Sequence, residues 1–282
     1  MLIKRVLSAL VLIPLVVLAA YQGGLWLAGL VALFAALAVI EFYQLSNRLG
    51  ARPSIWVGTA LTVGLVVAAQ LRAYRIGAPL FIGVLGALMV ERVWRQNFDG
   101  FLSDWATTLV GSAYIGGMLS HFVLLRGLQQ GLVWVALAIL VTWVTDTGAY
   151  FVGTTVGRRR FFPRISPRKT LEGAIGGLLL GTPTAMAIAI PLLHLPWPQA
   201  AALGVLIALA ATFGDLAESL IKRQAGVKDS GTLLAAHGGV LDRIDSICNQ
   251  SAADERSRKY RHAIATERPI DKYLMLNVNA RK

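Results

Sequence analysis

Hydrophobic residues occur in long runs from Val6 to about Ser219, and short polar stretches separate these runs. A run of about 20 apolar residues is long enough to cross the hydrocarbon core of a membrane as a helix. We therefore expect an all-α fold, a polytopic transmembrane bundle in one domain. The spacing predicts about eight helices, at roughly 6–20, 25–42, 55–71, 77–91, 106–125, 131–153, 173–194 and 200–220.

The first apolar run, VLSALVLIPLVVLAA, follows Lys4 and Arg5 and so has the outline of a secretory signal peptide. It lacks a small-residue cleavage context, and YQGG leads directly into the next run, so we predict a retained first helix. The chain has a single cysteine, Cys248, which excludes an internal disulfide framework.

Charge is sparse and mostly basic. Only 15% of the residues are charged, against about 25% in a typical soluble domain, and the formal net charge is +12. In a soluble protein this charge would suggest a nucleic-acid partner, but cytoplasmic loops of membrane proteins also accumulate basic residues next to anionic lipid. With Lys4 and Arg5 placed inside, most basic loops fall on that side. We therefore predict a bacterial inner-membrane protein with a cytoplasmic N-terminus, polar motifs facing the cytoplasm and no nucleic-acid partner.

Two carboxylates interrupt the apolar runs, Asp146 in WVTDTGAYFVG and Asp215 in GDLAESLIKR. A charged side chain in a membrane helix costs about 3 kcal/mol on insertion scales, so it usually faces a polar cavity or a partner. A structural ion pair or a helix-end position is the alternative. Asp215 and Ser219 share a helical face, as do Glu218 and Lys222. Hard oxygen ligands such as Asp and Ser favour Mg²⁺, especially where phosphates complete the coordination shell.

A basic loop, RRRFFPRISPRKTLEGAIGG, joins two of the expected helices. Pro167 and Glu172 suit the start of a helix, and a helix N-terminus flanked by Arg and Lys is a natural anion site. We therefore expect phosphate handling by Ser166, Lys169 and Thr170. The alternative, an ordinary positive-inside loop, is the interpretation we favour for the three arginines that open the stretch.

A second polar cluster, HGGVLDRIDS, follows the last long apolar run. Gly238 and Gly239 would let the backbone approach a ligand closely, and Asp242 and Asp245 are spaced for one helical face. A lone histidine such as His237 is more often structural than catalytic. The sequence lacks both GxxxxGK[ST] and GxGxxG, so neither soluble nucleotide-binding fold applies.

These motifs together carry a resemblance. The run SLIKRQAGVKDSGTLLAAHGGVLDRID, Ser219 to Asp245, closely resembles the signature of the phosphatidate cytidylyltransferases, and WVTDTGAYFVG and SPRKTLEGAIGG are similar to that family at matching order and spacing. The resemblance implies transfer of the CMP moiety of CTP to phosphatidic acid in the bilayer, giving CDP-diacylglycerol and pyrophosphate. It also implies Mg²⁺, with a second cation left open, and it makes a homodimer plausible.

The resemblance further implies roles for individual residues. The metal site would be organised by Asp215, Ser219 and Asp242. The catalytic set would be Asp215, Asp242, Lys222 and Arg243. The remaining substrate contacts would be Ser166, Lys169, Thr170, Glu172, Arg223, Lys228, Asp229, His237, Gly238, Gly239, Asp245 and Asp146.

Two features depart from the family pattern. Ala235-Ala236 stands where the family usually has Pro-Gly, and residues 246–282 form a polar tail, with eight Lys/Arg and four Asp/Glu, where the family continues into an apolar helix. We therefore divide the chain into a membrane domain, 1–245, with its catalytic half at about 143–245, and an atypical tail. A different reading frame or a rearranged gene end would produce such a tail.

Two other classes of function fit parts of the sequence. One is a catalytically impaired homologue that binds CTP or lipid without turnover. The other is an ion-coupled transporter with Asp146 and Asp215 on the ion path. The spaced D-G…A-R…G…D…D pattern of the CDP-alcohol phosphotransferases is absent from the sequence.

Overall fold

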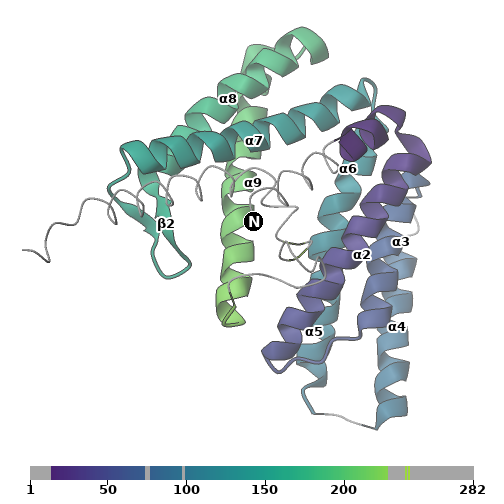
Figure 1. Ribbon diagram of the computed structural model, residues 1–282. Helices are drawn as coiled ribbons and strands as arrows, with labels where there is room; N and C mark the ends of the chain where they lie inside the picture. Colours follow the sequence, from purple (N-terminus) through teal and green to yellow (C-terminus); the bar gives the residue numbers. More distant parts are fainter. Residues whose placement is uncertain (1–13, 74–76, 97–98, 228–238, 240, 242–282) are drawn as a thin grey trace, which may run out of the picture.

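The structure is a computed structural model, and it describes residues 14–73, 77–96, 99–227, 239 and 241. Helices dominate these ranges, with one small β-hairpin (Figure 1). Residues 14–22 are helical. The elements that follow are α2 (Gly24–Arg48), α3 (Ile55–Gln70), α4 (Gly77–Arg95), α5 (Phe101–Gly111), η2 (Ser112–Gly117), α6 (Met118–Arg126), α7 (Gly131–Thr155), β1 (Arg160–Phe162), β2 (Ser166–Thr170), α8 (Leu171–Leu193) and α9 (Trp197–Gln224).

The expected all-α membrane fold is confirmed. Among the described helices, five are long and apolar enough to cross a membrane, and α3 is a shorter apolar helix. The five are α2, the continuous helix Phe101–Arg126, α7, α8 and α9. The ends differ from the expected ones because polar residues extend the helices beyond their apolar runs: α2 continues to Arg48 and α9 to Gln224. The first expected helix, 6–20, lies partly outside the described residues.

Helices α2–α6 form an N-terminal bundle with a core of large side chains. Phe42, Tyr43 and Leu45 of α2 are buried there together with residues of α3, η2 and α6. The Tyr43 hydroxyl donates to the Thr108 carbonyl at 2.7 Å and lies 2.8 Å from the Ser112 hydroxyl. The π-helical turn η2 begins at Ser112, so this buried network lies at the one place where the long helix is locally wider.

Helices α7–α9 pack more closely and form a C-terminal unit. Their core combines Leu137 and Val141 with three small residues, Ala185, Ala189 and Ala200. Glycines of α8 allow the close approach of α7: a Cβ added at Gly181 would lie 2.2 Å from the Thr145 hydroxyl oxygen. Small residues at helix interfaces are typical of membrane bundles, where close packing replaces much of the hydrophobic driving force.

The β-hairpin between α7 and α8 was not expected. Strands β1 and β2 pair antiparallel, Arg160 with Thr170 and Phe162 with Ser166. Pro167 therefore lies in a strand, and the prediction that it opens a helix is wrong. A two-stranded hairpin has only edge strands, which tolerate a proline. The helix begins at Leu171, and the Thr170 side chain caps it by accepting a hydrogen bond from the Gly173 amide at 3.1 Å.

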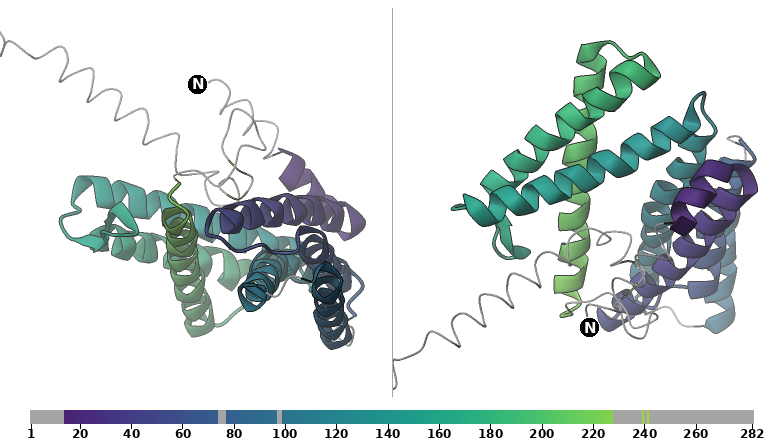
Figure 2. Two further views of the ribbon diagram at one scale, coloured as in Figure 1. Left: turned by 90° about the horizontal axis from the view of Figure 1, so that it is seen from below. Right: turned by 45° about the horizontal axis from the view of Figure 1, so that its top comes forward.

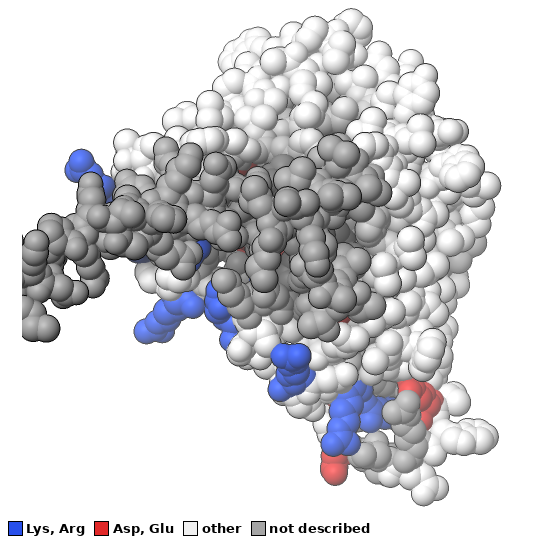
Figure 3. All heavy atoms as spheres, in the orientation of Figure 1, with Lys and Arg blue, Asp and Glu red and all other residues white. Residues whose placement is uncertain are grey.

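The two units lie side by side. Figures 1 and 2 show α7 leaving the N-terminal bundle and running to the hairpin, with α8 and α9 beside it. Figure 3 shows charged side chains along the lower and left margins of the view, near the hairpin and the far ends of the bundle helices. The upper and right parts of that face are uncharged. The chain is an integral membrane protein, and this uncharged surface suits contact with lipid.

Candidate functional site

The hairpin and α9 meet through an ion pair between Lys169 and Asp215. The two side chains are 26% and 21% exposed, so solvent still reaches the pair. Asp215 lies well before the end of α9, and the hairpin places the lysine beside it. Two of the motifs that the sequence singled out, SPRKT and GDLAES, are thereby brought together in space.

A second ion pair lies one helical turn further along α9. Lys222 donates to the Glu218 carboxylate at 3.0 Å, and the Glu218 side chain is only 5% exposed. The expected pairing of these two residues on one helical face is confirmed. Ser219 follows Asp215 by four residues on α9 and is half-buried, whereas Arg223 is exposed. The last turns of α9 therefore carry two carboxylates, a hydroxyl and two cations.

Other predicted contacts lie on the elements around α9. Asp146 is half-buried on α7, and Ser166 is half-buried at the start of β2. Thr170 is buried and its hydroxyl caps α8. The Glu172 carboxylate accepts hydrogen bonds from the backbone amides of Arg158 and Arg159, at 3.1 and 3.2 Å. Thr170 and Glu172 thus hold the basic loop against the start of α8, whatever contact they make with a ligand.

The structure describes only part of the HGGVLDRIDS stretch. Gly239 and Leu241 are described. The predicted site residues that lie outside the described residues are Lys228, Asp229, His237, Gly238, Asp242, Arg243 and Asp245. Their roles remain predictions.

Leu241 shows where this stretch meets the bundle. Its side chain is 6% exposed and belongs to the core of the N-terminal bundle. Its backbone amide donates to the carboxylate of Glu41 on α2 at 2.9 Å, and Glu41 is completely buried. Sequence reasoning missed Glu41, although the signal was present. It is a carboxylate inside an apolar run, the criterion that selected Asp146 and Asp215.

The described residues fit a magnesium site in part. Asp215 and Ser219 present a carboxylate and a hydroxyl on one helical face, and both are ligands that Mg²⁺ accepts. Within the described ranges no group of three or more His, Cys, Asp or Glu side chains is gathered. Such a site would therefore draw most of its ligands from water and substrate phosphates, as Mg²⁺ sites commonly do.

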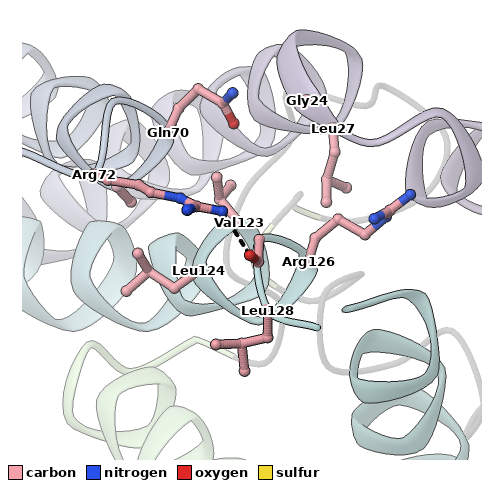
Figure 4. Close-up of a pocket in the computed structure, with 10 residues that line it drawn as sticks. Gly24, Leu27, Gln70, Arg72, Val123, Leu124, Arg126 and Leu128 are labelled. Atoms are coloured by element: carbon pink, nitrogen blue, oxygen red, sulfur yellow. Dashed lines mark hydrogen bonds between the residues drawn. The ribbon is translucent and has the colours of Figure 1, made fainter. Parts of the chain in front are cut away.

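A cavity of about 450 Å³ lies elsewhere, between the start of α2 and the ends of α3 and α6 (Figure 4). Arg72 spans part of it and donates to the Gly127 carbonyl at 2.6 Å, and Arg126 donates to the Ala20 carbonyl at 2.7 Å. Both guanidinium groups thus bind carbonyls near helix ends. The cavity adjoins the start of α7, whereas the hairpin follows its other end, about 37 Å away along a 25-residue helix.

These features define a helical membrane protein in which a lysine from a hairpin and a lysine from a helix end pair with two carboxylates of α9. Such a site suits charged phosphate groups. Residues 3–252 match the cytidylyltransferase family. The chain belongs to this family. The match ends just beyond the signature, near the start of the polar tail; the division at residue 245 remains a prediction.

Curated relatives agree over much of the chain. The phosphatidate cytidylyltransferase of Synechocystis is 33% identical over 278 residues, which cover 86% of this chain and 92% of the relative. The enzyme of that name from Staphylococcus haemolyticus is 33% identical over 248 residues, with the same coverage. The one from Bacillus subtilis is 37% identical over 161 residues, 56% of this chain and 58% of the relative.

Proposed function

We propose that this protein transfers the CMP moiety of CTP to phosphatidic acid, producing CDP-diacylglycerol and pyrophosphate for phospholipid synthesis. The family match and the relatives named phosphatidate cytidylyltransferase support this reaction. The structural observation that carries it is the Lys169–Asp215 pair, which joins two of the motifs that resemble the family. Neither a non-catalytic binding protein nor an ion-coupled transporter is favoured by these relatives.

The reaction sets a problem of charge. An oxygen of the phosphatidate phosphate attacks the α-phosphorus of CTP, and the bond from that phosphorus to the oxygen bridging it to the β-phosphorus breaks. Pyrophosphate leaves with the electrons of that bond. The attacking oxygen is already anionic near neutral pH, so no strong general base is required. The protein must instead hold two polyanions together and neutralise the leaving group.

The described residues can meet this demand at one end of the C-terminal unit. Lys169 and Lys222 supply two ammonium groups, each beside a carboxylate that holds it in place. Arg223 adds an exposed guanidinium on the next turn. A bound Mg²⁺, held by Asp215 and Ser219 together with Asp242, would supply further neutralisation of the phosphates.

The orientation follows from the loop charges. We place the hairpin and the end of α9 at the cytoplasmic face of a bacterial inner membrane, where CTP is found. The basic loops of the sequence support this placement. Phosphatidic acid would then reach the site from the bilayer, and CTP from the cytoplasm. A homodimer, which the family resemblance makes plausible, is part of this proposal.

The test is direct. The purified protein in mixed micelles is given labelled CTP, phosphatidic acid and Mg²⁺, and labelled CDP-diacylglycerol and released pyrophosphate are measured together. We expect both products in equal amounts, and neither product with EDTA or without phosphatidic acid. Binding of CTP without either product would contradict the proposed reaction and favour the impaired homologue. Uptake of an ion by vesicles without any dependence on CTP would favour the transporter.

A further inference from the structure

The cavity of about 450 Å³ between α2, α3 and α6 lies outside the proposed catalytic site. It adjoins Gly24, where α2 begins, and Arg126, where the continuous helix Phe101–Arg126 ends. Both helices are long and apolar enough to cross a membrane. Trp26, in the first turn of α2, is 71% exposed, and exposed tryptophans are enriched at the level of lipid headgroups. The cavity therefore lies where membrane spans end.

The wall of this cavity is apolar over much of its surface and cationic at two points. Leu27, Val123 and Leu124 supply apolar side chains, and Arg72 and Arg126 supply two guanidinium groups (Figure 4). None of the described residues that line the cavity is acidic. The lining thus places uncompensated positive charge beside an apolar surface. This combination is complementary to an anionic lipid, which has a negative headgroup next to apolar chains.

Arg72 occupies a backbone position that usually belongs to glycine. At the end of α3 the amide of Arg72 donates to the Ala69 carbonyl at 3.1 Å, and the amide of Ala73 donates to the Ala68 carbonyl at 3.0 Å. In this helix-ending motif the residue at the place of Arg72 takes the left-handed conformation, here with φ 51°, which glycine adopts most readily. Glycine would end α3 with less strain. The arginine is therefore explained by its side chain and not by its backbone.

The two guanidinium groups use their donors differently. Arg126 donates from Nε to the Ala20 carbonyl at 2.7 Å and from Nη2 to the Tyr21 carbonyl at 3.0 Å, so it holds the turn before α2. Arg72 is exposed and donates from Nη2 to the Gly127 carbonyl at 2.6 Å (Figure 4). A guanidinium has five N–H donors in a planar fork that suits phosphate oxygens. Arg72 therefore keeps donors for a ligand.

We propose that this cavity binds the phosphate headgroup of an anionic phospholipid, with Arg72 as the main phosphate ligand. The apolar wall takes the adjoining part of the lipid, which is why a lipid fits better than free phosphate. The positive lining favours an anionic lipid over a zwitterionic one. The site adjoins the start of α7, about 37 Å along that 25-residue helix from the hairpin, and takes no part in the transfer reaction.

Lipid titration tests the role of Arg72. The purified protein in a nonionic detergent is titrated with phosphatidylglycerol or with phosphatidylcholine, and bound lipid is measured by native mass spectrometry. We expect phosphatidylglycerol to bind at least about tenfold more tightly. Arg72→Gln should weaken its binding about tenfold, because charge-assisted hydrogen bonds are lost, and Arg72→Lys less than about threefold. Equal phosphatidylglycerol affinity in the wild-type protein and Arg72→Gln would overturn the proposal.

Two further substitutions separate binding from folding. Arg72→Gly suits the left-handed backbone, so we expect the thermal midpoint without added lipid to stay near the wild-type value while phosphatidylglycerol binding falls about tenfold. If binding falls only together with the midpoint, Arg72 is merely part of the helix end and the proposal fails. Leu128, which lines the cavity, is 52% exposed. Leu128→Asp should weaken binding by adding a negative charge to the lining, and Leu128→Asn should weaken it much less.

Matched controls locate the lipid. Arg48→Gln removes an exposed arginine from the other end of α2, and Lys169→Gln removes a cation of the proposed catalytic site. We expect each to change phosphatidylglycerol affinity less than about twofold. If Lys169→Gln abolishes binding and Arg72→Gln does not, the lipid binds beside the hairpin and the proposal is wrong. Displacement of the lipid by inorganic phosphate at the same concentration would also overturn it, because the cavity would then select a free anion.

Discussion

The two halves of this protein solve different problems with different side chains. The N-terminal bundle, α2–α6, has a core of large residues crossed by a buried polar network around Tyr43. The C-terminal unit, α7–α9 with its hairpin, has a core in which three alanines pack with Leu137 and Val141. Its ion pairs lie where the hairpin and the last turns of α9 meet. In the proposed function, the half with recognisable motifs would carry the charges that meet the substrates, whereas the other half would form the membrane frame beside it.

The largest expected effect is a loss of activity from a substitution in the C-terminal unit. Asp215→Asn removes the carboxylate that pairs with Lys169 and is expected to bind metal. We expect kcat to fall by about 1,000-fold or more, as when a main electrostatic group is lost from an active site. The variant should still be extracted from membranes as a folded protein, with unchanged helical circular dichroism. If the Asp215→Asn variant turns over as fast as the wild-type protein in detergent, Asp215 is not a metal ligand.

The next effect is a loss of stability in the N-terminal bundle, α2–α6. A Cβ added at Gly58 of α3 would lie 2.1 Å from the Tyr43 hydroxyl, inside the polar network of the N-terminal bundle. We expect Gly58→Ala to lower the free energy of unfolding by about 1–3 kcal/mol through overpacking. Thermal unfolding in detergent is the measurement. At Gly214 of α9 an added Cβ would meet nothing within 4 Å, so Gly214→Ala should be neutral or stabilising.

A smaller change removes one atom from the same network. Tyr43→Phe deletes the hydroxyl that binds the Thr108 carbonyl and the Ser112 side chain. We expect a loss of about 1–2 kcal/mol in the free energy of unfolding, because two buried partners lose a hydrogen bond. The KM for CTP should not change. If Tyr43→Phe raises the KM for CTP and leaves the stability unaltered, the N-terminal network contributes to substrate binding. The division of roles between the two halves would then be wrong.

The smallest expected effect lies at the start of α8. Thr170→Ala removes the hydroxyl that accepts from the Gly173 amide, and loss of such a cap costs about 1 kcal/mol. Thr170→Ser keeps the acceptor and should restore the stability. For each variant, the stability is measured by thermal unfolding and the KM for CTP is measured by turnover. If Thr170→Ser restores the stability but not the KM, Thr170 also contacts the substrate, as the sequence indicated.

The apolar runs predicted the helices because membrane spans are set mainly by length and hydrophobicity, which are local properties of the sequence. The Glu218–Lys222 pair could be predicted for the same reason, since helical spacing fixes it. The hairpin could not, because Pro167 in SPRKT and the nearby Glu172 also suit a helix start. Neither could the Lys169–Asp215 and Glu41–Leu241 contacts, which depend on how helices distant in the sequence are arranged. Sequence reasoning missed Glu41, whose only signal was a charged residue type in an apolar run.

The 200-residue separation of Glu41 and Leu241 has a consequence for biogenesis. The ribosome makes the N-terminal segment first, so α2 enters the membrane long before residue 241 has been synthesised. During that interval the buried carboxylate lacks one of its native donors and has to rely on water, lipid headgroups or insertion factors. The closing contact forms only once the signature has been made. A chain released before that point would lack the contact that ties residue 241 to α2.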